Sequence, residues 1–112
     1  EAQLHLGTPY VWGGGSRRGA DCSGFVQMVF ARCGTTLPRA ARAQAGVGRA
    51  VLATELCPGD RIYFRTGTGP IDHTGIYIGD ARFIHASGRR GRVVISRLDD
   101  PRYARRYAFA RR

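Results

Sequence analysis

One cysteine and two histidines of this chain carry the side chains best suited to covalent catalysis. Cys22 stands between Asp21 and Ser23, and His73 and His85 follow in the second half of the sequence. A thiol attacks a carbonyl carbon only as the thiolate, and an imidazole is the side chain that takes up its proton near neutral pH. A second imidazole can hold the first in the tautomer that this transfer requires. If the fold brings the three together, they predict nucleophilic catalysis through Cys22.

A helix is predicted to begin at Cys22. Asp21 is a favourable N-cap residue, because its carboxylate can accept hydrogen bonds from the amides of the first turn. The positive end of the helix dipole and the free amides at this position favour the thiolate. On this segment alone, Cys22 is interpreted equally well as a nucleophile and as an inert core thiol. Apolar residues then recur at helical spacing: Val26, Val29, Phe30 and Cys33.

The two histidines fall on predicted strands joined by a tight turn. Residues 74–78 and 82–86 are rich in β-formers, and Gly79-Asp80 between them is typical of a two-residue hairpin turn. Counted outward from that turn, His73 is almost level with His85, and both side chains are expected on one face of the sheet. A lone strand-end histidine usually bonds a carbonyl. The pair, taken with the cysteine, favours a nucleophile, a base and an orienting group.

The elements around these residues predict a fold of the α+β class. The predicted helices come first along the chain and a run of strands joined by turns follows. This order indicates N-terminal helices packed on a five- to six-stranded antiparallel sheet. The 112 residues suit a single domain over residues 1–112. Helices are expected within residues 1–6, 21–33 and 38–45, with a helical turn in 101–107, and strands at 61–64, 74–78, 82–86, 92–96 and 107–110.

The charge of the chain favours an anionic partner. The formal net charge is +10, and all 18 basic residues are arginines. Such a surface suits nucleic acid, anionic lipid head groups or an acidic cell-wall polymer. No aromatic-interleaved RNA motif or recognition-helix pattern accompanies the arginines, so a surface that steers acidic substrates is favoured over specific nucleic-acid binding. No stretch approaches the ~20 apolar residues that a membrane span requires.

The remaining cysteines and the third histidine are expected to be structural. An odd count of three cysteines does not indicate a disulfide framework. Cys33 and Cys57 could pair in an oxidising compartment or remain as two thiols, and the helical spacing of Cys33 favours buried thiols. His5 is expected on an exposed helix face without a role. Cysteine and histidine spacing fits no zinc site, so neither a metal nor a cofactor is expected.

Several motifs resemble those of the NlpC/P60 cysteine peptidases in order and spacing. Together they cover nearly the whole chain, and the segment around Cys22 and the C-terminal end are most similar to the murein endopeptidase lipoproteins of Gram-negative bacteria. The motifs are Pro9-Tyr10-Val11-Trp12-Gly13-Gly14, Asp21-Cys22-Ser23-Gly24-Phe25-Val26, Leu37-Pro38-Arg39, Pro58-Gly59-Asp60, His73-Thr74-Gly75-Ile76-Tyr77-Ile78-Gly79 and Phe83-Ile84-His85-Ala86-Ser87.

The resemblance implies a papain-like minimal fold and hydrolysis of amide bonds in peptidoglycan stem peptides. The bond is either the D-Ala–diaminopimelate crosslink or the γ-D-Glu–diaminopimelate bond within a stem. Carried over by position, Cys22 is the nucleophile, His73 the base and His85 the group that orients the base. The residues expected to contact substrate are Tyr10, Asp21 and Ser23, and Arg39 is expected only to add a charge facing the groove.

The resemblance also implies a place and a set of partners. We expect a monomer in the periplasm or secreted, which binds stem peptides and no specific nucleic acid. The chain begins inside a predicted helix, so we expect a processed product. The full-length protein could be an outer-membrane lipoprotein, anchored through a segment outside residues 1–112. Alternatives are a secreted antibacterial or phage-type effector with the same chemistry, and a thiol acyltransferase or amidase, for which no acyl-binding segment is visible. A wall-binding module or a nucleic-acid-binding domain leaves the cysteine and histidines unexplained.

Overall fold

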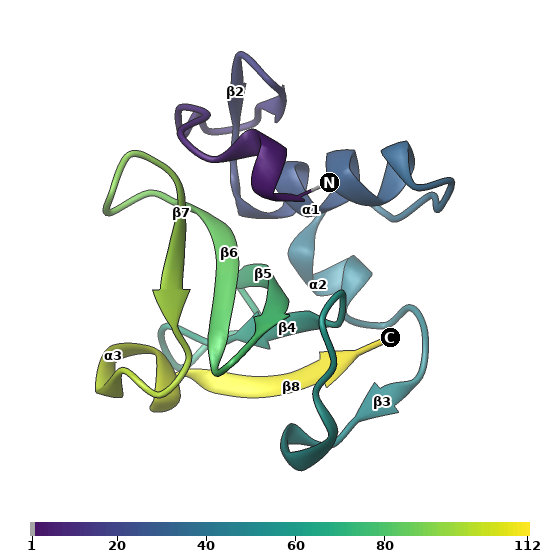
Figure 1. The fold of residues 1–112 in the computed structure, drawn as a ribbon, viewed down its shortest axis with the longest axis vertical. Helices are drawn as coiled ribbons and strands as arrows, with labels where there is room; N and C mark the ends of the chain where they lie inside the picture. Colours follow the sequence, from purple (N-terminus) through teal and green to yellow (C-terminus); the bar gives the residue numbers. More distant parts are fainter. Residues whose placement is uncertain (1) are drawn as a thin grey trace.

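The computed structural model describes residues 2–112 and is built on a six-stranded antiparallel sheet (Figure 1). The strand order is β3-β8-β4-β5-β6-β7, so β4 to β7 form a meander and β8 returns beside β4. In Figure 1 β6 and β7 run across the direction of β8, which shows how strongly the sheet coils. The strands are β3 (Ala50–Val51), β4 (Arg61–Phe64), β5 (His73–Gly79), β6 (Arg82–Ser87), β7 (Arg92–Arg97) and β8 (Tyr107–Arg111).

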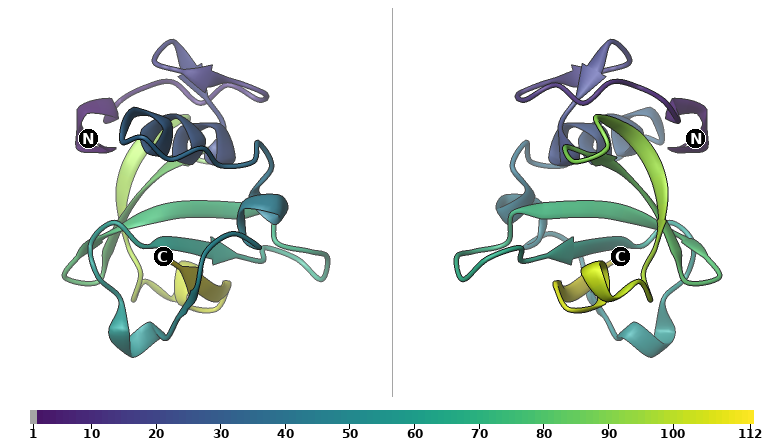
Figure 2. Two further views of the ribbon diagram at one scale, coloured as in Figure 1. Left: turned by 90° about the vertical axis from the view of Figure 1, so that its right-hand side faces the viewer. Right: turned by 90° about the vertical axis from the view of Figure 1, so that its left-hand side faces the viewer.

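The helices are few and short, and they lie on both sides of this sheet. Figure 2 shows α1 on one side, beneath a small hairpin of β1 and β2, and α3 on the other. The predicted order of N-terminal helices and a later antiparallel meander is confirmed. The elements are η1 (Ala2–His5), β1 (Gly15–Ser16), β2 (Gly19–Ala20), α1 (Cys22–Arg32), α2 (Ala41–Gln44), η2 (Ala53–Glu55) and α3 (Pro101–Ala104). Within residues 2–112 no helix is long and apolar enough to cross a membrane.

The core lies mainly between α1 and the sheet. The helix buries Phe25, Val26 and Val29. Of the residues that the helical spacing predicts on the core face, Val26 and Val29 are buried, Phe30 is half-buried and Cys33 is exposed. These side chains pack with residues of β5, β6 and β7, namely Ile76, Ile84, Ala86 and Val93. A second cluster lies around α3, where Phe64, Phe83 and Tyr103 stack edge to face or tilted against one another. The sheet is therefore covered on both faces at the strands that carry the two histidines.

The predicted helix at residues 38–45 is shorter than expected. Only Ala41–Gln44 is helical, and Ala40 is extended at φ −90° and ψ 144°. The side chain of Gln44 donates to the carbonyls of Pro38 at 2.8 Å and of Ser23 at 3.0 Å, which holds the preceding segment against the start of α1. Extended backbone there lets Arg39 reach the N-terminus of α1.

The expectation of buried thiols at Cys33 and Cys57 is wrong. Both are exposed free cysteines. Cys33 is the C-cap of α1, one residue past the last helical position, and it lines an open pocket between this end of the helix and β5 instead of packing in the core. Cys57 lies in a turn that is held by its amide, which donates to Asp60 at 2.9 Å, and the thiol is left outside.

The expectation of an exposed His5 is also wrong. His5 is only 1% exposed, and its ring lies edge-on to Phe25 with ring centroids 6.2 Å apart. The reason is that η1 is a single 3-10 turn pressed against α1, so its last residue points inward. Glu1, the first residue of the predicted helix, lies outside the described residues.

The hairpin that carries the histidines differs from the prediction by one residue. Asp80 and Ala81, with φ of 54° and 58°, form the turn, and the register shifts between Tyr77 and Gly79. A strand that slips by one residue turns its side chains to the other face. An unbulged turn at Gly79-Asp80 would thus have placed His73 and His85 on opposite faces. The bulge restores the common face that the site needs.

Candidate active site

Cys22 lies at the junction between α1 and the sheet. It is the first residue of α1, and Asp21 is the N-cap, whose carboxylate accepts from the amide of Gly24 at 2.8 Å. The thiol is half-buried, and its sulfur lies 3.8 Å from the carbonyl oxygen of Asp72, the residue before His73. The sequence therefore positions the sulfur at a helix N-terminus and against the residue that precedes β5.

The resting state of Cys22 and His73 is a neutral pair. Burial raises the pKa of the Cys22 thiol, and hydrogen bonds from the backbone of Thr74 and Ser23 only partly oppose this. Burial also lowers the pKa of His73 to about 4, although the charge of Asp72 acts in the opposite direction. At neutral pH the imidazole is therefore unprotonated and free to accept a proton from the thiol as attack begins.

His85 lies directly behind His73. Nε2 of His73 is 2.8 Å from Nδ1 of His85, and the rings cross at 80° with centroids 5.0 Å apart. His85 is 1% exposed, and burial, with the nearby charges of His73 and Arg89, lowers its pKa to about 2. Two neutral imidazoles can share only one hydrogen between these nitrogens. If His73 donates through Nε2, its Nδ1 keeps a free lone pair for the proton of the thiol.

Gly75 makes room for the histidine pair. A Cβ at this position would lie 3.0 Å from the Cβ of His85 and 2.9 Å from the ring of Phe83. Real Cβ contacts essentially never fall below 3.0 Å, so the ring of Phe83 must shift, while the Cβ of His85 must give by a few tenths of an ångström.

We therefore expect Gly75→Ala to lower the free energy of unfolding by about 1–3 kcal/mol and to reduce catalysis, because the added methyl group displaces the ring of Phe83, which packs on the ring of His85 with centroids 4.4 Å apart. Urea unfolding and steady-state kinetics measure the two effects. Gly67→Ala is the matched control, since a Cβ at Gly67 meets no atom within 4 Å. Equal behaviour of the two variants would contradict this account of Gly75.

Arg39 clamps the two residues that flank the nucleophile. Its guanidinium lies 2.9 Å from Asp21 Oδ1 and 3.0 Å from Oδ2, and it donates to Ser23 Oγ at 2.9 Å and to the carbonyl of Gly14 at 3.1 Å. Burial opposes ionisation of Asp21. The hydrogen bonds from Arg39 and from the amides of Gly24 and Gly13 nevertheless hold the pKa of that carboxyl below its usual range.

This clamp is a larger role than the sequence indicated for Arg39, which was expected only as a charge facing the groove. The one signal was its place in Leu37-Pro38-Arg39, because nothing in a linear sequence shows that this segment crosses the start of α1. Asp21 and Ser23 are largely buried and already bonded within the protein. If Asp21 and Ser23 contact the substrate, they do so with side chains that Arg39 holds in place.

The predicted site residues gather along one open groove of about 470 Å³. His85 is the exception, since it lies behind His73 and does not line the groove. Burial raises the pKa of Tyr10, and the charges of Cys22 and Asp21 add to this, so its hydroxyl stays protonated as a hydrogen-bond donor. Trp12, for which the sequence predicts no role, also lines the groove and is 86% exposed. The lining includes Tyr10, Trp12, Asp21, Cys22, Ser23, Arg39, Arg42, Asp72 and His73.

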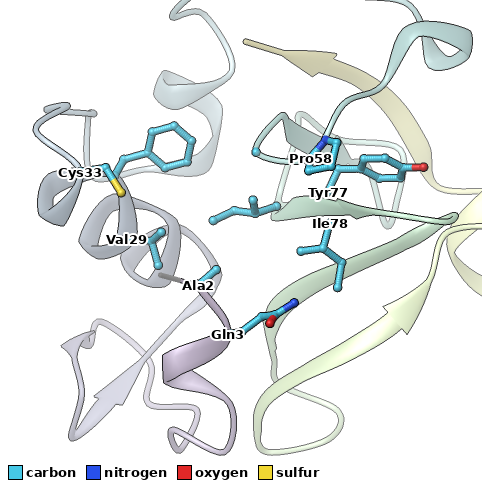
Figure 3. Close-up of a pocket in the computed structure, with 10 residues that line it drawn as sticks. Ala2, Gln3, Val29, Cys33, Pro58, Tyr77 and Ile78 are labelled. Atoms are coloured by element: carbon cyan, nitrogen blue, oxygen red, sulfur yellow. The ribbon is translucent and has the colours of Figure 1, made fainter.

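A second pocket, of about 410 Å³, lies between the C-terminal half of α1 and β5 (Figure 3). Figure 3 shows Val29 of α1 and Cys33, the C-cap of that helix, facing Tyr77 and Ile78 across the hollow. Its lining is mostly apolar, and no histidine or carboxylate belongs to the described residues that form it, so Cys33 lacks a base there. The groove at Cys22 is therefore the candidate site for catalysis. Among residues 2–112, no cluster of three histidine, cysteine or acidic side chains is placed to hold a metal ion.

Comparison with known proteins supports the resemblance. A sequence profile described as the NlpC/P60 family matches residues 7–112. The probable endopeptidase NlpC of Escherichia coli (strain K12) is 44% identical over 114 residues, which cover 100% of this chain and 73% of that protein. The murein DD-endopeptidase MepS/murein LD-carboxypeptidase of the same strain is 44% identical over 108 residues, which cover 95% of this chain and 56% of that protein.

A solved structure supports the fold in the same way. The crystal structure of an NlpC/P60 family protein from Bacillus cereus ATCC 10987 matches with a TM-score of 0.93 and 40% sequence identity. The match covers 99% of this chain and 37% of that one, so the chain corresponds to part of a longer protein there. The predicted α+β fold is confirmed, while the roles of the individual site residues stay predictions.

Proposed function

The chain belongs to the NlpC/P60 family, and from that premise we propose that it is a cysteine endopeptidase acting on peptidoglycan stem peptides. One observation carries the proposal: a half-buried thiol at the start of α1 shares a groove with a neutral imidazole that is backed by a second one. The similarity to MepS, a murein DD-endopeptidase/murein LD-carboxypeptidase, supports the substrate class.

The first half of the reaction uses the Cys22–His73 pair. His73 takes the proton of the Cys22 thiol, and the sulfur bonds to the carbonyl carbon of the scissile amide. The carbonyl oxygen gains the negative charge, and the donors at the groove are the protonated hydroxyl of Tyr10 and those amides at the start of α1 that do not already bond to Asp21. The carbon–nitrogen bond then breaks, and the imidazolium of His73 gives its proton to the leaving amine.

The second half restores the enzyme. The acyl group is now a thioester on Cys22, and His73 is again neutral. A water molecule gives a proton to His73 and attacks the thioester carbon, and the thiolate leaves and is reprotonated by the imidazolium. His85 stays neutral throughout the reaction, because its ring is buried and no water can solvate a positive charge on it.

Charge supports a substrate rich in carboxylates. The net charge of +10 favours approach of anionic cell-wall material, and Arg42 adds an exposed cation to the groove. Asp21 remains ionised because its pKa is lowered, so it can contact an amino group of the stem peptide beside Ser23. We place the enzyme as a monomer in the cell envelope, in the periplasm or secreted, where peptidoglycan is found. We also propose anchoring to the outer membrane through a segment outside residues 1–112.

The test is digestion of defined muropeptides, crosslinked and uncrosslinked, with products identified by mass spectrometry under reducing conditions. We expect cleavage by the wild type, none by Cys22→Ala, and wild-type activity for Cys33→Ser, which changes an exposed thiol outside the groove. Product masses distinguish the D-Ala–diaminopimelate crosslink from the γ-D-Glu–diaminopimelate bond. Absence of any cleavage by the wild type would refute the proposed activity, and cleavage by Cys22→Ala would refute the mechanism.

A further inference from the structure

Ser96 occupies the far end of the histidine pair. Nε2 of His85, the nitrogen that does not face His73, lies 2.9 Å from the hydroxyl oxygen of Ser96. We propose that Ser96 is a positioning residue that fixes the tautomer of His85 and, through it, the tautomer of His73. The importance of this role for catalysis rests on the proposed function, whereas the tautomer itself does not.

The sheet brings these three residues into one line. In the β6–β7 register His85 is opposite Val94, and Phe83 is opposite Ser96, so Ser96 is the diagonal neighbour of His85 on the same face. His73, His85 and Ser96 thus stand on the successive strands β5, β6 and β7 (Figure 1).

Counting protons along this line allows only one productive arrangement. For His73 to accept a proton at Nδ1, its Nε2 must carry hydrogen and donate to Nδ1 of His85. Nδ1 of His85 must then be unprotonated, which places the hydrogen of that neutral ring on Nε2. That hydrogen needs an acceptor, and the oxygen of Ser96 lies at hydrogen-bond distance from it.

The opposite arrangement would disable the base. If Ser96 donated to His85, then Nδ1 of His85 would carry the hydrogen and donate to Nε2 of His73. His73 would then hold its own hydrogen on Nδ1, pointing away from His85, and could not take the proton of the thiol.

The surroundings of His85 make the hydroxyl hard to replace. The ring is 1% exposed and packs against Phe83 and Tyr103, with ring centroids at 4.4 and 5.4 Å. Ser96 is half-buried, so its own O–H can turn to solvent while its oxygen accepts from His85. Loss of the hydroxyl leaves a buried N–H without that acceptor, and the other tautomer of His85 then becomes competitive.

The first readout needs no substrate. Imidazole ¹⁵N chemical shifts report which ring nitrogen carries hydrogen, and we expect the Nε2–H form for both His73 and His85 in the wild type. Ser96→Ala is expected to shift His85 toward the Nδ1–H form and Ser96→Thr to retain the wild-type form. Thr54→Ala, which removes an exposed hydroxyl from η2, is expected to change nothing. Thermal unfolding of each variant checks that the fold is retained.

The second readout is reactivity. In Ser96→Ala we expect kcat to fall about tenfold with KM little changed, well short of the loss of 10²–10⁴ that follows removal of a general base. The alkylation rate of Cys22, followed by peptide mass spectrometry, should fall with it and recover in Ser96→Thr. An Nδ1–H form of His85 in the wild type would overturn the proposal, as would unchanged tautomers or unchanged Cys22 alkylation in Ser96→Ala. Tautomer shifts and altered alkylation in a protein that cleaves no muropeptide would uphold the role of Ser96 while refuting the proposed substrate.

Discussion

Replacement of His73 by glutamine is expected to lower kcat/KM by about 10²–10⁴. Glutamine retains a polar group that can bond to His85, but it cannot accept the proton of the Cys22 thiol. Since burial raises the pKa of that thiol, very little thiolate forms at neutral pH without the base. Steady-state kinetics on a muropeptide substrate measure the loss, with Glu55→Gln on exposed η2 as a control that should keep full activity. Unchanged activity in His73→Gln would show that another group takes the proton.

The same base sets the acid limit of activity. Burial lowers the pKa of His73 from 6.5 to about 4, so the imidazole remains neutral and competent well below pH 6.5. The acid limb of kcat/KM is therefore expected near pH 4 in the range where the protein stays folded. An acid limb of kcat/KM near pH 6.5, the ordinary pKa of histidine, would indicate that water reaches the imidazole of His73 and that burial does not set its pKa.

The elements of this fold could be predicted because their signals are local. Runs of β-branched and aromatic residues between turns predict the strands at residues 61–64, 82–86 and 92–96. An N-cap residue followed by apolar residues at helical spacing predicts α1. The burial of side chains at element ends depends instead on where packing stops. Cys33 lies just past that limit, and His5 just within it.

The site was predictable only in its reactive atoms. Cys22, His73 and His85 have side chains with few other uses in this arrangement, so their types and spacing pointed to the chemistry. The bulge next to Gly79 was not predictable, although it alone decides that both histidines share a face. Arg39 and Ser96 carry no local signal, because their roles arise from a segment crossing the helix start and from a third strand.

The histidine pair is also expected to make the fold sensitive to acid. Both imidazoles remain neutral in the folded protein, where burial lowers the pKa to about 4 for His73 and to about 2 for His85. The unfolded chain binds protons at both from about pH 6.5 downward, so it holds more protons than the native state. The free energy of unfolding therefore falls as the pH drops, by about 1.4 kcal/mol per pH unit for each histidine. Two pH units would remove about 5 kcal/mol, which is comparable to the whole stability of many small domains.

Urea unfolding between about pH 6.5 and 4.5, compared for the wild type and the double variant His73→Gln/His85→Gln, isolates this contribution. The carboxyl groups of Asp21 and Asp60 also have lowered pKa values, but the stability they contribute is lost below about pH 4, outside this window. His5 is present in both proteins and cancels in the comparison. The wild type is expected to lose stability steeply across the window and the double variant to lose much less. Equal slopes would mean that the two imidazoles gain protons in the folded state, and the neutral pair on which proton transfer from Cys22 depends would then be wrong.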